Sequence, residues 1–83
     1  MKAKIENVDI RGCEQKTSKK GGEYLLVRFE DETGKPYELV DKDIDRKDYY
    51  KRGTIGDLWI DIDQGRQYTN IRVIDFKQTD KEA

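Results

Sequence analysis

The sequence contains no histidine, and only one cysteine, one proline and one tryptophan among its 83 residues. Without histidine, the commonest general base and the usual partner of a catalytic cysteine are both missing. The lone Cys13 excludes an internal disulfide framework and predicts a reducing, cytoplasmic location. We expect Cys13 itself to be a small filler at a strand end rather than a reactive thiol.

Long hydrophobic runs are also missing. Residues 1–10 alternate charged and aliphatic side chains, which predicts neither a signal peptide nor a membrane segment. With 42% charged and 34% hydrophobic residues, the chain has enough apolar material for one thin core. The predicted single domain covers residues 1–78, and residues 79–83 are expected to form a frayed, charged tail.

Motifs for catalysis or metal binding are scarce. There is no paired nucleophile and base, no glycine-rich phosphate loop and no cysteine spacing for a metal. Asp41, Asp43 and Asp45 imitate the start of a calcium loop, but Arg46 stands where such a loop needs glycine, and Arg52 where it needs glutamate. We therefore expect a protein that is not an enzyme and that has no cofactor and no metal.

What the chain does contain is a series of short alternating segments. Strands are expected at about residues 2–11, 23–30, 35–40, 55–63 and 68–77, with a short helix within residues 41–53. Residues 12–22 read as a mobile loop. The apolar parity slips near Asn7 and again at Ile74, which predicts two bulges. This order of elements, with three strands, a short helix and two further strands, predicts an all-β fold, a five-stranded OB-fold-like barrel.

The same alternation predicts the core. Ile44, together with Tyr49 or Tyr50, would close one end of the barrel. The side chains expected to face inward are Leu25, Val27, Phe29, Leu58, Ile60, Ile62, Ile71 and Val73.

The net charge is only −1, but its distribution is uneven. Residues 1–20 carry six Lys or Arg against three Asp or Glu, whereas residues 31–50 carry four against seven. A local basic surface is therefore possible, and phosphate binding needs no more than that. In an OB-fold, the connections between strands one and two and between strands four and five flank the oligonucleotide groove. Here these connections carry Lys16, Lys19 and Lys20 on one side and Arg66 and Tyr68 on the other.

Tyr24 and Arg28 share one face of the second strand, which suits base stacking next to a backbone contact. The orientation of Tyr37 depends on register. A tight turn at residues 31–34, ending in a left-handed glycine, pairs Phe29 with Tyr37 and places Tyr37 inside. A register slipped by one puts Tyr37 and Leu39 on the outer face but turns Glu38 inward, which costs several kcal/mol. Both registers remain open at this point.

Residues 34–39, Gly-Lys-Pro-Tyr-Glu-Leu, resemble the Gly-Lys-Pro-Tyr-x-Leu segment of the small phage- and plasmid-borne OB-fold single-stranded-DNA-binding proteins of the filamentous-phage helix-destabilising type. The resemblance implies that Tyr37 and Leu39 lie on the DNA-binding face, and it implies a role in phage or mobile-element replication. This chain is more acidic than that family, and a tight turn replaces the family's long hairpin between strands two and three.

Two functions follow as hypotheses. In the first, the barrel binds single-stranded DNA with little sequence preference; the contacts would be Lys16, Lys19, Lys20, Arg28 and Arg66 to phosphates, Tyr24, Tyr37 and Tyr68 to bases, and Leu39 by resemblance. In the second, an outward apolar patch serves a protein partner or a homodimer. That patch would consist of Leu26, Val40 and Trp59.

Overall fold

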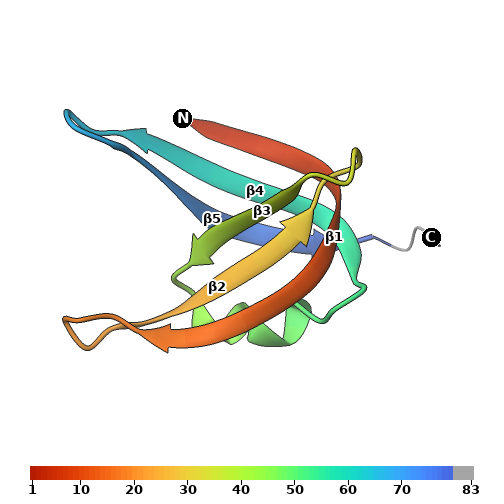
Figure 1. Cartoon of the computed structure of the whole chain (residues 1–83), viewed down its shortest axis with the longest axis horizontal. Helices are drawn as coiled ribbons and strands as arrows, with labels where there is room; N and C mark the ends of the chain where they lie inside the picture. Colours follow the sequence, from red (N-terminus) through yellow and green to blue (C-terminus); the bar gives the residue numbers. More distant parts are fainter. Residues whose placement is uncertain (80–83) are drawn as a thin grey trace.

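The computed structural model describes residues 1–79 and shows five strands and one short helix (Figure 1). The elements in chain order are β1 (Lys2–Thr17), β2 (Glu23–Glu30), β3 (Pro36–Asp41), the 3-10 helix η1 (Ile44–Tyr49), β4 (Ile55–Gln64) and β5 (Thr69–Gln78). The expected sequence of elements is confirmed.

The strands close into a barrel in the order β1-β2-β3-β5-β4. The long strand β1 pairs antiparallel with β2 through its second half and with β4 through its first half. A short parallel ladder between β3 and β5, in which Val40 pairs with Arg72 and Asp41 with Val73, completes the closure. With a helix between β3 and β4, this is an OB-fold-like barrel, as predicted.

β1 serves two neighbours because it bends sharply. Its register with β4 shifts between Ile5 and Val8, and Asn7 between them adopts a φ of 55°. The Asn7 N–H leaves the ladder and donates instead to the Asp57 carboxylate at 3.2 Å. The predicted bulge near Asn7 is confirmed, and it provides the corner that a small barrel needs.

The prediction of a loop over residues 12–22 is wrong. β1 continues to Thr17, which pairs with Glu23, and only residues 18–22 form the turn. The Ser18 N–H donates to the Gly22 carbonyl at 2.7 Å, and Gly21 takes a φ of 89°. The extension was missed because this part of the hairpin is mostly exposed, so no apolar alternation marks it.

The β2–β3 hairpin has the register that its turn chemistry favours. Gly34 has a φ of 84°, and the Asp31 carboxylate accepts hydrogen bonds from the Thr33 hydroxyl at 2.6 Å and the Lys35 N–H at 3.0 Å. These hydrogen bonds, with that of the Thr33 hydroxyl contributing most, lower the pKa of Asp31. Phe29 pairs with Tyr37 across the hairpin, so the slipped register does not occur.

The core is thin and continuous. Every inward residue predicted on β2 is buried, and Ile62 is half-buried against the core. Ile71, which was also expected inside, is 41% exposed. It pairs with Ile62 near the end of the β4–β5 hairpin, where the barrel no longer covers that face. The buried apolar residues are Val8, Ile10, Leu25, Val27, Phe29, Tyr50, Leu58, Ile60, Val73 and Phe76.

The second predicted bulge lies in β5. The register with β4 shifts where Trp59 pairs with Asp75 and Ile60 pairs with Val73, so Ile74 has no opposite residue. The extra residue lets Val73 and Phe76 both point into the core. The predicted change of parity is confirmed.

The helix η1 is held to the barrel by a buried carboxylate. Asp43 caps the helix by accepting from the Asp45 N–H at 3.1 Å. Asp41 is fully buried, and it accepts from Arg46 Nη1 at 2.8 Å and from the Tyr50 hydroxyl. Tyr50 is thus the tyrosine that closes the barrel, because Tyr49 is 57% exposed.

At the end of the domain, Thr79 is still attached to the barrel. Its N–H donates to the Ile55 carbonyl at 3.0 Å, so the expected tail does not include Thr79. The rest of that predicted tail lies outside the described residues. Within residues 1–79, no helix is both long and apolar enough to cross a membrane.

Candidate nucleic-acid interface

Two hairpins project from the same side of the barrel, with the end of β3 between them (Figure 1). We call them the β1–β2 arm, whose turn is residues 18–22, and the β4–β5 arm, whose turn is residues 65–68. Both arms exist because their strands pair beyond the part of the barrel that has a core. These are the two connections that flank the ligand groove of OB-folds.

A groove runs between the arms over the outer face of β2, β3 and β5. It consists of two cavities of about 440 and 390 Å³ that share Val40 and Lys42. Its floor is apolar, since Leu26 and Val40 are register partners on the outer face and both are half-buried. The other lining residues are Ser18, Gly22, Glu23 and Tyr24 from the β1–β2 arm and β2, and Asp61, Asp63, Asn70, Ile71 and Arg72 from the β4–β5 arm.

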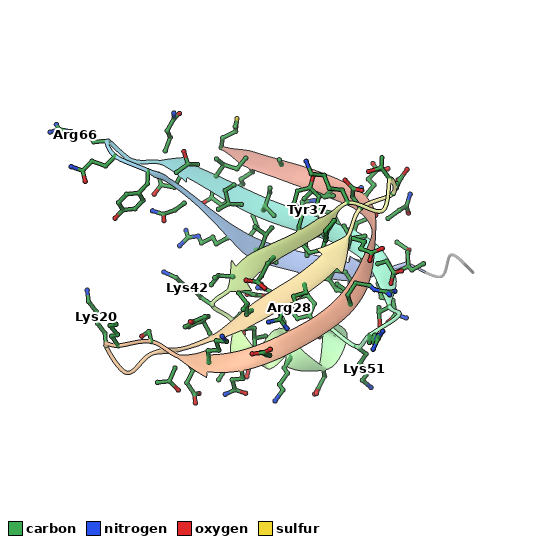
Figure 2. All side chains as sticks on the ribbon, in the orientation of Figure 1. Lys20, Arg28, Tyr37, Lys42, Lys51 and Arg66 are labelled. Atoms are coloured by element: carbon green, nitrogen blue, oxygen red, sulfur yellow. The ribbon has the colours of Figure 1, made fainter. Side chains whose placement is uncertain are left out.

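Exposed cations stand around this groove. Figure 2 shows Lys20 and Arg66 at the tips of the two arms, with Lys42 between them at the end of β3. Lys20, Lys42 and Arg66 form no ion pair with any of the residues 1–79, and neither does Lys19. Because their charges are uncompensated, these four side chains are available to phosphates.

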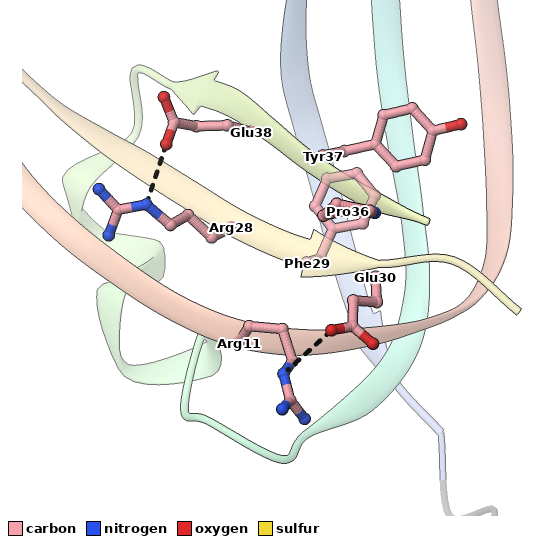
Figure 3. Close-up of a pocket in the computed structure, with 7 residues that line it drawn as sticks. All are labelled: Arg11, Arg28, Phe29, Glu30, Pro36, Tyr37 and Glu38. Carbon is pink, nitrogen blue, oxygen red and sulfur yellow. Dashed lines mark hydrogen bonds and ion pairs between the residues drawn. The ribbon is translucent and has the colours of Figure 1, made fainter. Parts of the chain in front are cut away.

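Two of the predicted basic contacts are already engaged. Arg28 donates from Nε to Glu38 and from Nη1 to Glu14, both at 2.9 Å, and Lys16 lies 3.8 Å from Glu14. Hydrogen bonds to Glu14 and Glu38 raise the pKa of Arg28, while the hydrogen bond from Arg28 lowers the pKa of Glu14. Figure 3 shows the Arg28 guanidinium turned toward Glu38.

The predicted aromatic contacts divide into two groups. Tyr24 lines the groove, whereas Tyr68, which is 68% exposed, lies in the turn of the β4–β5 arm and is not among the lining residues. Tyr37 lies elsewhere, with its ring stacked on Phe29 at a centroid distance of 5.5 Å (Figure 3).

The register of the β2–β3 hairpin therefore places Tyr37 and Leu39, the two residues implied by the family resemblance, away from the groove. Leu39 packs against the core, and Tyr37 is 38% exposed at the barrel rim on the same side of the sheet as Phe29. Tyr37 is only partly covered because it lies near the start of β3, where the barrel opens. Of the two registers that the sequence left open, the one that turns Tyr37 inward is observed, but Tyr37 is not buried, and neither Tyr37 nor Leu39 lines the groove.

Sequence reasoning missed Lys42, Asn70 and Arg72 as groove residues. Lys42 lies directly after the third strand, and in an OB-fold that position falls between the two flanking connections. The position of Lys42 in the strand order could therefore have identified it as a groove residue. Asn70 and Arg72 have the outward parity that the predicted inward positions of Ile71 and Val73 imply, but only the structure shows that this face of β5 lines the groove.

The apolar patch predicted for a partner does not form one surface. Leu26 and Val40 are adjacent in the groove floor, but Trp59 has Lys4 and Asp75 as its register partners on neighbouring strands. The Lys4 ammonium lies 5.2 Å from the centre of the Trp59 ring and covers part of it. β5 lies between β3 and β4, so Trp59 is separated from Leu26 and Val40, although it is on the same strand as the groove residues Asp61 and Asp63.

Neither a metal site nor a reactive thiol emerges from the described part of the chain. Among residues 1–79, no group of three or more acidic or cysteine side chains is arranged to hold a metal ion. Cys13 is half-buried and packs against the core, and its burial raises the pKa of the thiol. Outside the groove, a cavity of about 340 Å³ lies beside Tyr37 and is bordered by the Arg11–Glu30 and Arg28–Glu38 ion pairs (Figure 3).

No protein-family model matches the chain, and no curated protein or solved structure is significantly similar to it. The resemblance of residues 34–39 to the phage- and plasmid-borne family therefore stays a prediction. A function can therefore be inferred from the groove alone.

Proposed function

We propose that this protein is a non-catalytic module that binds single-stranded DNA in the groove between its two arms. The observation that carries the proposal is the combination of an apolar floor with uncompensated cations around it. Leu26 and Val40 form the floor and Lys42 lines both cavities, while Lys20 and Arg66 stand at the tips of the two arms.

Each part of the groove matches one part of a single strand. Unpaired bases have apolar faces that stack on aromatic rings, and Tyr24 and Tyr68 supply a ring on each arm. The phosphates carry one negative charge per nucleotide, and Lys20, Lys42 and Arg66 can meet them from the rim. A duplex has its bases covered by stacking, so it would use only the cations and bind more weakly.

A direct test is fluorescence anisotropy of a labelled oligo-dT of about 15 nucleotides, within the range of OB-fold site sizes. Binding is expected to saturate at micromolar protein in low salt and to weaken as salt rises, because phosphate neutralisation releases counterions. Lys42→Gln should weaken binding, whereas Lys47→Gln, which removes an exposed cation on η1 outside the groove, should not. Absence of saturable binding in low salt would contradict the proposal.

A protein partner or second copy is the other candidate, favoured by the same apolar floor at Leu26 and Val40. Sedimentation over a range of concentrations distinguishes it in part, since a constant monomer excludes a homodimer. If Leu26→Asp abolishes self-association in a chain that does not bind oligo-dT, the groove serves a second copy instead of DNA.

A further inference from the structure

The groove carries opposite charges on its two sides. Lys42, at the end of β3, has no ion-pair partner among residues 1–79. On the β4–β5 arm, Asp61 and Asp63 line the same cavity. Glu23 lines only the other cavity of the groove, the one beside the β1–β2 arm. In the cavity beside the β4–β5 arm, the cation of Lys42, directly after β3, therefore faces carboxylates on β4.

Only one of those carboxylates is uncompensated. Asp61 lies 3.5 Å from the Met1 ammonium and 3.4 Å from Arg72 Nη2. The exposed Asp63 carboxylate makes no hydrogen bond or ion pair within the described part of the chain. Its register partner on β5 is Asn70, which also lines the cavity.

This arrangement orients a bound strand. An ionised carboxylate repels phosphate and only accepts hydrogen bonds. Within this cavity, the sugar–phosphate backbone is therefore expected on the Lys42 side, with the bases there turned toward Asp63 and Asn70. Base edges that reach this side of the groove meet the Asp63 carboxylate, which offers two acceptor oxygens.

We propose that Asp63 makes the groove prefer guanine. Guanine presents two adjacent N–H donors, on N1 and on the exocyclic N2, which match the two carboxylate oxygens. Thymine presents a single N–H between two carbonyl oxygens, and these oxygens are repelled by the carboxylate. Cytosine and adenine present one amino group beside a ring nitrogen that only accepts. The inference rests on the proposed binding of single-stranded DNA. It changes that proposal in one respect, because the groove would select guanine instead of binding with little sequence preference.

The experiment is a competition against labelled oligo-dT. The competitors are unlabelled oligo-dT and the same oligonucleotide with a few isolated thymines replaced by guanine or by hypoxanthine, which lacks the N2 amino group. The guanine oligonucleotide is expected to bind at least about 5-fold more tightly than oligo-dT, the lower end for a bidentate base contact. The hypoxanthine oligonucleotide should lose most of that gain.

Asp63→Ala removes the acceptor and is expected to bring the guanine-to-thymine ratio close to one, while binding to oligo-dT becomes stronger. The matched control is Asp48→Ala on η1, which changes the net charge equally but lies outside the groove and should keep the ratio. Circular dichroism would verify that both variants fold. The guanine preference is contradicted if the guanine and hypoxanthine oligonucleotides bind equally well, or if the preference for guanine survives Asp63→Ala. In either case, binding of oligo-dT would still support the proposed function. If no oligonucleotide binds, both proposals fall.

Discussion

Arg28 on β2 and Glu38 on β3 are register partners, and Arg28 Nε donates to the Glu38 carboxylate at 2.9 Å. The same guanidinium donates to Glu14 on β1, so it links three strands across the outer face of the sheet. Hydrogen bonds to these carboxylates raise the pKa of Arg28 and balance its charge before any ligand binds. The structure therefore favours a structural role for Arg28 over the phosphate contact expected from sequence.

A charge-balanced double variant tests the role of Arg28. Because Arg28→Gln with Glu38→Gln removes one cation and one anion, we expect the oligo-dT affinity to change little, whereas Lys42→Gln should weaken it several-fold. Anisotropy titrations of the three proteins under one salt condition give the comparison. A loss in the double variant as large as that of Lys42→Gln would mean that Arg28 contacts phosphate.

The cations at the rim are expected to determine the salt dependence of binding. Each of Lys20→Gln, Lys42→Gln and Arg66→Gln should reduce the slope of log affinity against log salt by about 0.7, the value for one phosphate contact on a single strand. Titrations at several salt concentrations measure the slope. Lys47→Gln serves as the control and should leave it unchanged. Equal slopes in all four variants would contradict the placement of the phosphates between the arms.

The tyrosines are expected to differ in function. Tyr24→Ala and Tyr68→Ala should each weaken oligo-dT binding by about 1–3 kcal/mol, the range for one base stacked on an aromatic ring. Tyr24→Phe keeps the ring and should retain most of the affinity. Tyr37→Ala should leave binding nearly unchanged but lower the melting temperature, because it removes the ring that stacks on Phe29. A large binding loss for Tyr37→Ala would instead support the DNA-binding face implied by the family resemblance.

Tyr50 is expected to contribute stability that alkaline conditions remove. Burial, followed by the hydrogen bond that its hydroxyl donates to Asp41, raises the pKa of the Tyr50 phenol. The folded state thus holds this proton more tightly than the unfolded chain, in which tyrosine has a pKa of about 10. By linkage, the stabilisation is complete below pH of about 10 and is lost progressively as the pH rises above that value.

Urea denaturation of the wild type and Tyr50→Phe at neutral and alkaline pH measures this contribution. At neutral pH, Tyr50→Phe should lower the free energy of unfolding by about 1–3 kcal/mol, because the buried Asp41 loses a donor. The difference between the two proteins should shrink above pH of about 10. Tyr49→Phe, at an exposed neighbour, should behave like the wild type. A difference that is constant across this pH range would exclude the proposed linkage.

Much of the fold could be predicted because it depends on local patterns. The alternation of Leu25, Val27 and Phe29 requires a strand with one buried face, and all three side chains are buried. The turn ending at Gly34, which has a φ of 84°, favours the observed pairing of Phe29 with Tyr37, although the sequence also left the slipped register open. The extension of β1 through Thr17 could not be predicted, since neither face of that segment is buried enough to leave a pattern.

The candidate site was predicted only in part. The two flanking connections, with Lys19, Lys20, Arg66 and Tyr68, follow from the order of the strands. Lys42 was missed although it directly follows the third strand, because it belongs to neither of the two connections that flank an OB-fold groove. The pairing of Arg28 was missed because its two carboxylate partners come from different strands.

The five strands, the helix between the third and fourth and the two bulges could be derived from the sequence, and the turn at residues 31–34 favoured one of the two hairpin registers. These features depend on side-chain alternation and backbone preferences over a few residues. The tertiary structure alone decided which charges are compensated and which face the groove. Arg28 forms ion pairs with Glu14 and Glu38, whereas Lys42 and Asp63 have no partner within residues 1–79. The reason is that barrel closure brings charges from distant segments to within hydrogen-bonding distance at Arg28 and leaves them apart at the groove.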